Sequence, residues 1–95
     1  MRREHTTTVG NGETATFDAE TLGFSPSVWN ATIAVESGVG TYTVQFRING
    51  VWYGADELTD VADTDVAVVR QIGFDAIRAT AATGGDITAV FWKTV

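Results

Sequence analysis

The one histidine of this chain, His5, is the first residue to consider for chemistry, because a Ser–His–Asp arrangement would need it. A catalytic base must be held within hydrogen-bond reach of its partner. His5 lies in a polar N-terminal stretch that we expect to form an arm, which cannot hold a base in this way. The chain has no cysteine, which excludes cysteine nucleophiles, disulfides and thiolate metal sites. These residues predict that the protein is not an enzyme.

The densest group of charges is the acidic segment, residues 56–65, whose acids are Asp56, Glu57, Asp60, Asp63 and Asp65. Calcium takes six to eight oxygen ligands, so the weak candidates for a metal site are Asp56, Asp60, Asp63 and Asp65. Their spacing does not match an EF-hand, which needs a glycine at its sixth position and a glutamate at its twelfth. A glycosidase would need two carboxyl groups about 5–10 Å apart beside a sugar cleft, for which a domain this small leaves little room. We interpret the segment as a solvated loop and expect no metal and no cofactor.

Large apolar side chains on both faces of the expected strands are the main indication of function. Trp52 and Tyr53 are consecutive, so in a strand they point to opposite faces. Phe74 falls out of phase with the strand that follows it. A strand that is apolar on both faces is either covered on both sides or meets a partner, and exposed Trp and Tyr are enriched at protein interfaces. Core packing and sugar stacking are the alternatives. The expected interface residues are Trp52, Tyr53, Phe74, Val90 and Trp92, with Arg2 and Arg3 from the arm.

Alternation of apolar and polar residues predicts the strands that must position these side chains. It is clearest over residues 14–19, 29–36 and 41–48, where every second residue is apolar. Shorter strands are expected over 51–53 and 66–72, and the last two over about 77–82 and 87–94. Only residues 56–62 suit a helical turn.

Turn residues separate these strands. Asn49-Gly50 is typical of a type I′ hairpin, because both central residues of that turn need positive φ. Glycine-containing segments at 37–40 and 83–86 predict two further hairpins. Seven or eight short strands joined in this way predict an all-β fold, a small antiparallel β-sandwich that is either Ig-like or jelly-roll-like. We expect one domain over residues 13–95, preceded by a polar arm over 1–12 that could include one edge strand at 5–9.

Size and charge restrict the partners. A 95-residue chain buries only about 60–65% of the surface that its unfolded form exposes, so oligomerisation would help to stabilise it. The formal net charge of −6 argues against binding nucleic acid or anionic lipid. No run of about 18 apolar residues is present, so no membrane span is expected.

Two segments resemble a known family. The run Gly40–Trp52, GTYTVQFRINGVW, and the run Gly73–Ala81, GFDAIRATA, are similar to a strand-and-turn pattern of small β-sandwich virion structural proteins of tailed bacteriophages. The resemblance covers roughly residues 29–95. It implies a non-catalytic, homo-oligomeric capsid decoration (cement) or head–tail accessory protein that binds the major capsid or tail protein. Such a protein would reside in the virion after assembly in the host cytoplasm. A carbohydrate-binding or host-attachment module is the alternative.

Overall fold

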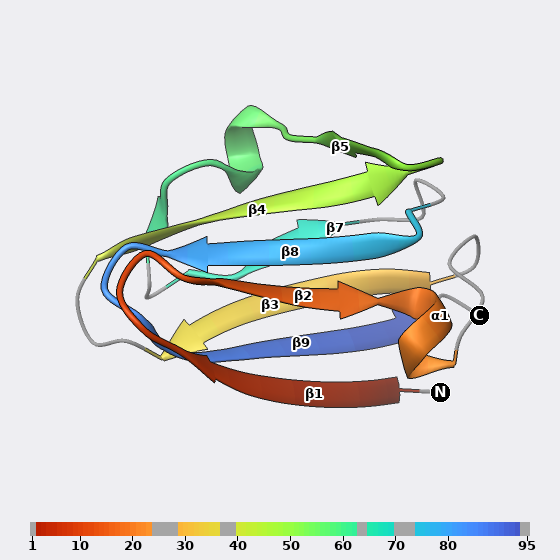
Figure 1. Ribbon diagram of the computed structural model, residues 1–95, viewed down its shortest axis with the longest axis horizontal. Coiled ribbons are helices and arrows are strands. Elements are labelled where there is room, and N and C mark those ends of the chain that lie inside the picture. Colours follow the sequence, from red (N-terminus) through yellow and green to blue (C-terminus); the bar gives the residue numbers. More distant parts are fainter. Residues whose placement is uncertain (1, 24–28, 37–39, 63–64, 70–73, 94–95) are drawn as a thin grey trace.

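The computed structural model describes residues 2–23, 29–36, 40–62, 65–69 and 74–93, and these residues form two packed β-sheets (Figure 1). The strands are β1 Arg2–Val9, β2 Thr14–Asp18, β3 Trp29–Glu36, β4 Thr41–Ile48, β5 Val51–Tyr53, β6 Val61–Ala62, β7 Ala67–Val69, β8 Ala76–Ala81 and β9 Gly85–Lys93. The helical elements are the short helix α1, Ala19–Leu22, and the 3₁₀ turn η2, Asp56–Leu58. The all-β sandwich predicted from the sequence is confirmed, and η2 lies where the helical turn was expected.

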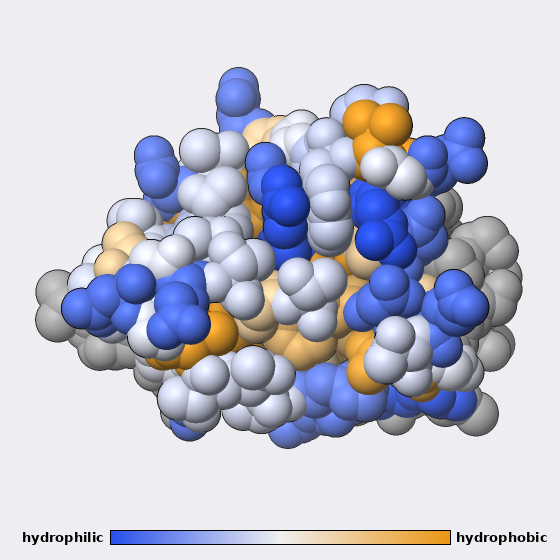
Figure 2. Space-filling view, viewed as in Figure 1, coloured by the Kyte–Doolittle hydropathy of each residue, from blue (hydrophilic) through white to orange (hydrophobic). Residues whose placement is uncertain are grey.

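The order of the strands is that of a jelly roll, which decides between the two sandwich topologies that the sequence left open. One sheet has the order β1-β9-β3-β7, and the other has the order β2-β8-β4-β5 with β6 beside β4. Every pairing is antiparallel. Apart from β4, β5 and β6, which share a sheet, each strand is followed along the chain by a strand of the opposite sheet. Figure 2 shows the outer face of the β2-β8-β4-β5 sheet, which is mostly hydrophilic or neutral, with a hydrophobic patch over β5.

Only one of the three predicted hairpins is present. Asn49 and Gly50 have φ angles of 50° and 83° and join β4 to β5, as their sequence predicts. The hairpin prediction is wrong for the other two segments, because β3 and β4 belong to different sheets, as do β8 and β9. Residues 37–39 of the first segment lie outside the described part of the chain. Gly84 shows why glycine is needed in the second of these connections. Its φ is +70°, and a Cβ there would lie 2.7 Å from the carbonyl carbon of Gly10 in the β1–β2 turn.

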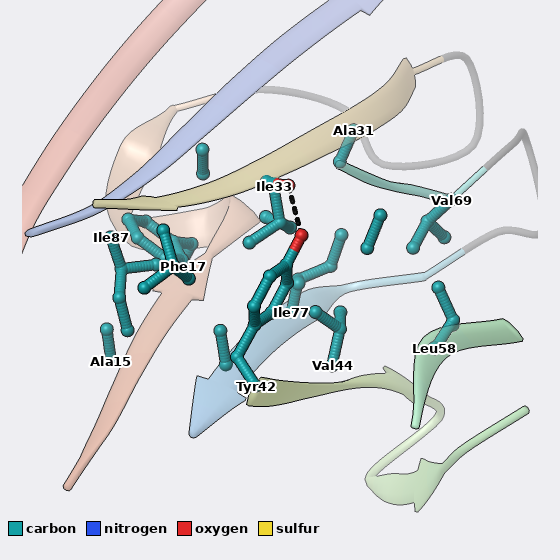
Figure 3. Close-up of a cluster of buried hydrophobic side chains, with 14 of the residues drawn as sticks. Ala15, Phe17, Ala31, Ile33, Tyr42, Val44, Leu58, Val69, Ile77 and Ile87 are labelled. Carbon is teal, nitrogen blue, oxygen red and sulfur yellow. Dashed lines mark hydrogen bonds between the residues drawn. The ribbon is translucent and has the colours of Figure 1, made fainter. Parts of the chain in front are cut away.

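The core lies between the sheets and consists of the apolar residues that alternate along the strands (Figure 3). Ile33 of β3 and Val44 of β4 are fully buried from opposite sheets. Tyr42 joins the two layers, because its hydroxyl donates toward the carbonyl oxygens of Ile33 (3.1 Å) and Asp65 (2.6 Å). Burial, together with the nearby charge of Asp65, raises the pKa of Tyr42 to about 12.

The N-terminal residues are a strand and not an arm, which corrects the predicted domain boundary at residue 13. All eight residues of β1 pair with β9, from Arg2 opposite Trp92 to Val9 opposite Gly85. β9 is a nine-residue strand, and β3 pairs with its other edge, so without β1 one edge of β9 would lack hydrogen-bond partners. The expected edge strand at 5–9 is therefore real but begins three residues earlier. The predicted strand over 66–72 is present as β7, and its residues 70–72 lie outside the described part of the chain.

Candidate interaction face and sheet edges

Trp52 lies on the outer face of the β2-β8-β4-β5 sheet, where it is half-buried between two arginines. The guanidinium carbon of Arg78 is 4.1 Å from the centroid of the indole ring, and that of Arg47 is 5.5 Å away. The strand register explains this arrangement. Arg47 is the cross-strand partner of Trp52, while Gln45, two residues earlier on β4, pairs with Arg78 of β8. We call these four residues, Trp52, Arg47, Arg78 and Gln45, the Trp–Arg cluster.

Arg47 is neutralised by two carboxylates. Its Nη2 lies 3.0 Å from Oδ2 of Asp18, and its Nε donates to Oδ1 of Asp75. Ala76 is the register partner of both Arg47 and Asp18, and its small side chain leaves room for the arginine to cross β8. The hydrogen bonds with Asp75 and then Asp18 raise the pKa of Arg47. Desolvation alone would raise the pKa of Asp18, but hydrogen bonds from Arg47 and two backbone amides lower it.

Arg78 keeps unused hydrogen-bond donors. Its Nε donates to Oε1 of Gln45 at 2.8 Å, while its two Nη atoms have no acceptor among the described residues. The indole Nε1 of Trp52 likewise has no acceptor in the part of the chain that the structure describes. The Trp–Arg cluster therefore presents a cation, a flat aromatic ring and several N–H groups together. Such a surface suits a carboxylate or another anionic group with several acceptor oxygens.

Tyr53 occupies the opposite face of β5, as its position next to Trp52 predicts. It is 47% exposed, and its ring stacks on that of Phe46 with 6.2 Å between centroids. Val51 lies on the same face of β5 and is 52% exposed. The side of β5 that faces the core therefore carries apolar side chains that are partly exposed to solvent in the monomer.

Trp92 and Val90 lie on the outer face of the other sheet, so the structure does not bring them together with Trp52. Trp92 is half-buried because its indole lies toward β3, where Nε1 donates to Oγ1 of Thr32 at 3.0 Å. Asn30, next to it in register, is 1% exposed and donates to the carbonyl oxygen of Trp92 at 3.4 Å. Trp52 and Trp92 therefore lie on opposite outer faces of the sandwich, and neither is sealed in the core.

Phe74 is a core residue, which corrects its expected place at an interface. It is 0% exposed, and its ring centroid lies 6.4 Å from that of Phe91. It is out of phase with β8 because it precedes the strand, so the alternation of β8 does not apply to it. Arg3 donates from Nη1 to the carbonyl oxygen of Leu22 at 2.9 Å, which fixes β1 to α1. Arg2 belongs to β1, and its side chain lies outside the described part.

The remaining candidates for chemistry find no support. No group of three or more metal-ligating side chains occurs among the described residues, which include Asp56, Asp60 and Asp65 but not Asp63. His5 packs edge-on against Phe91, with 6.1 Å between ring centroids, and its buried Nε2 has no hydrogen-bond partner among the described residues. Within the described ranges, no helix has the length and apolar character needed to cross a membrane.

The sheets end in strands that pair on one side only. β1 and β7 are the outer strands of one sheet, and β2 and β5 are the outer strands of the other. Among the described residues, nothing pairs with the second edge of any of these four strands. β1 is the longest of them, with eight residues paired to β9 in unbroken register.

No family model matches the sequence, and no curated protein matches it. Among solved structures, the chain is similar to a protein of the Bacillus endospore appendages, which are described as a novel family of disulfide-linked pili. The TM-score is 0.55, the sequence identity is 20%, and the similarity covers 100% of this chain and 88% of the other. The likeness supports the fold. The hypothesis of a phage virion structural protein is wrong, because the solved structure to which this chain is similar belongs to bacterial endospore appendages and not to a phage capsid or tail.

Proposed function

We propose that this chain is a non-catalytic structural subunit that assembles with copies of itself through the edges of its sheets. The observation that carries the proposal is the edge strand β1, whose eight residues pair with β9 on one side while the other edge is open among the described residues. The unpaired N–H and C=O groups of such a strand form a template for a strand of another chain.

The composition of β1 favours this use of its edge. Natural proteins protect edge strands with charges, prolines, bulges or short length. β1 has charged residues only at its start, Arg2 to Glu4, while residues 6–9 are uncharged and contain no proline. Its register with β9 is unbroken, so no bulge twists the edge away. Backbone pairing along residues 6–9 of β1 would add a strand of another copy to the sheet, as in other cases of β-strand addition.

The far side of the sandwich supports the same conclusion. β5 is the edge strand there, and its side chains Val51 and Tyr53 are 52% and 47% exposed. Burying these side chains against another copy would remove apolar area from water at about 25 cal/mol per Å². The similar Bacillus protein belongs to endospore appendages that are described as disulfide-linked pili. This chain has no cysteine, so contacts between its copies would be non-covalent.

The test is the oligomeric state, measured by sedimentation velocity or light scattering over a range of concentrations. A lysine on an edge strand opposes pairing with another chain, so Thr6→Lys should weaken self-association. Thr88→Lys is the matched control. Thr88 is the register partner of Thr6, and the two share the Oγ1–Oγ1 hydrogen bond of 3.0 Å, so either variant loses that bond. β9, however, is an interior strand, so only the Thr6 change lies at an edge.

Two results would count against the proposal. A wild-type protein that stays monomeric at every concentration would refute the proposed self-assembly. Equal self-association of wild type and Thr6→Lys would show that the edge of β1 is not used.

A further inference from the structure

We propose a second contact between copies of this chain, in which the Trp–Arg cluster of one copy binds carboxylates of the acidic segment of another across a two-fold axis. The inference rests on the proposed self-assembly but concerns a face of the sandwich, whereas the proposed function concerns its edges. The two can therefore fail separately.

The Trp–Arg cluster offers hydrogen-bond donors for which the described part of the chain provides no acceptor. Arg47 is already paired with Asp18 and Asp75, so it adds little net charge. Arg78 has no carboxylate partner among the described residues, and its two Nη atoms are open. A guanidinium with two free N–H groups binds a carboxylate through two parallel hydrogen bonds. The neighbouring indole N–H of Trp52 can donate to the same group.

The acidic segment offers matching acceptors. Asp56, Glu57 and Asp60 are exposed, and none of the three carboxylates lies in an ion pair with a described cation. Within the described ranges, the chain thus holds a cation without a carboxylate partner beside an aromatic ring and, separately, three carboxylates that form no ion pair. On a protein of net charge −6, a contact between two copies is favoured where opposite local charges meet.

Both features lie at the same face, which favours a symmetric contact. The backbone N–H of Asp60 donates to Oγ1 of Thr43 at 3.2 Å. Thr43 lies on β4 two residues before Gln45 and shares its outward side. The acidic segment therefore borders the face that carries the Trp–Arg cluster. In a two-fold contact, residue i meets residue j and residue j meets residue i, so a face with adjacent opposite charges is complementary to itself.

Charge reversal and its repair test the contact. Arg78→Glu should weaken dimer formation at least roughly tenfold, as should the double change Asp56→Lys with Glu57→Lys, because each places like charges opposite one another. The triple variant that combines these changes should restore dimerisation, because both charges are then exchanged at both copies of the contact. Sedimentation equilibrium measures the dissociation constants, and raising NaCl should weaken the wild-type dimer.

The controls separate this contact from the edge contact and from misfolding. Glu20→Lys reverses one charge at an exposed acid of α1, away from the proposed contact, and should leave dimerisation unchanged. Asp56 and Glu57 are exposed and have no side-chain partner in the described part, so their variants keep the test valid even if Arg78→Glu unfolds. Unchanged dimerisation in the acidic-segment variant would overturn the inference, as would a triple variant no better than the single reversals. If Thr6→Lys weakens association while these reversals do not, the proposed function stands and this inference fails.

Discussion

Replacing Trp52 with alanine should lower the stability of the isolated domain by about 1–2 kcal/mol. The size of this loss follows from two guanidinium groups near the Trp52 ring, whose carbons lie 4.1 Å (Arg78) and 5.5 Å (Arg47) from the ring centroid. A cation–π contact at an exposed site contributes about 0.5–1 kcal/mol. For a domain of this size, each kcal/mol corresponds to a change in Tm of about 4–8 °C. Urea unfolding followed by circular dichroism, at a concentration low enough to keep the protein monomeric, measures the loss.

A double-mutant cycle makes this prediction specific. The coupling between Trp52→Ala and Arg78→Met should be about 0.5–1 kcal/mol, and the coupling with Arg47→Met should be smaller because that guanidinium is farther from the ring. Trp92→Ala combined with Arg78→Met is the control, since Trp92 lies on the other sheet and the two changes should be additive. A coupling energy of zero between Trp52 and Arg78 would refute the reading of this surface as one interacting cluster.

Two further predictions concern the core. Tyr42→Phe should cost about 1–3 kcal/mol, because it removes the buried donor to the carbonyl oxygens of Ile33 and Asp65. Since the folded pKa of about 12 exceeds the unfolded value of 10.0, the contribution of Tyr42 is complete below pH 10 and is lost as the pH rises toward 12; urea melts over this range should show a smaller alkaline loss in Tyr42→Phe than in wild type. Phe74→Ala should cost about 3–5 kcal/mol in urea unfolding of the monomer, because its ring is fully buried against Phe91; a loss below 1 kcal/mol would contradict a core role.

The strands and their buried faces could be read from the sequence, whereas their partners could not. A period of two identifies which residues share a face, and Ile33 and Val44 are buried as that period predicts. It carries no information about which sheet a strand joins. Glycine turns at 37–40 and 83–86 suit a tight reversal within one sheet and a crossing between sheets equally well. The jelly-roll order of the strands therefore could not be predicted from the alternation and the turn residues.

The edge strand β1 and the short helix α1 were the elements that the sequence predicted least well. β1 looks like a polar arm because its core-facing side carries Arg3, His5 and Thr7 before it reaches Val9, so the apolar alternation is almost absent. Helix α1 was also missed, although its capping residues are present in the sequence. Asp18 accepts hydrogen bonds from the first-turn amides, and Gly23 ends the helix with φ of 77°.

The sequence indicated only part of the Trp–Arg cluster. Adjacent Trp52 and Tyr53 predict that one aromatic side chain leaves the core, and both are at least partly exposed. The arginines that flank Trp52 come from β4 and β8, which are brought together by register alone. Because Arg78 is 26 positions from Trp52, no local pattern could indicate that their side chains meet.

Salt dependence can distinguish the two proposed contacts, since they rest on different forces. Pairing at the edge of β1 uses backbone hydrogen bonds, which salt hardly screens, while the net charge of −6 opposes the approach of two copies. Added salt should therefore strengthen association through the edge. Contact through the Trp–Arg cluster depends on attraction between Arg78 and the acidic segment, which added salt weakens. Because the chain contains no cysteine to lock either contact covalently, both are reversible, and the sign of the salt effect tells which one dominates.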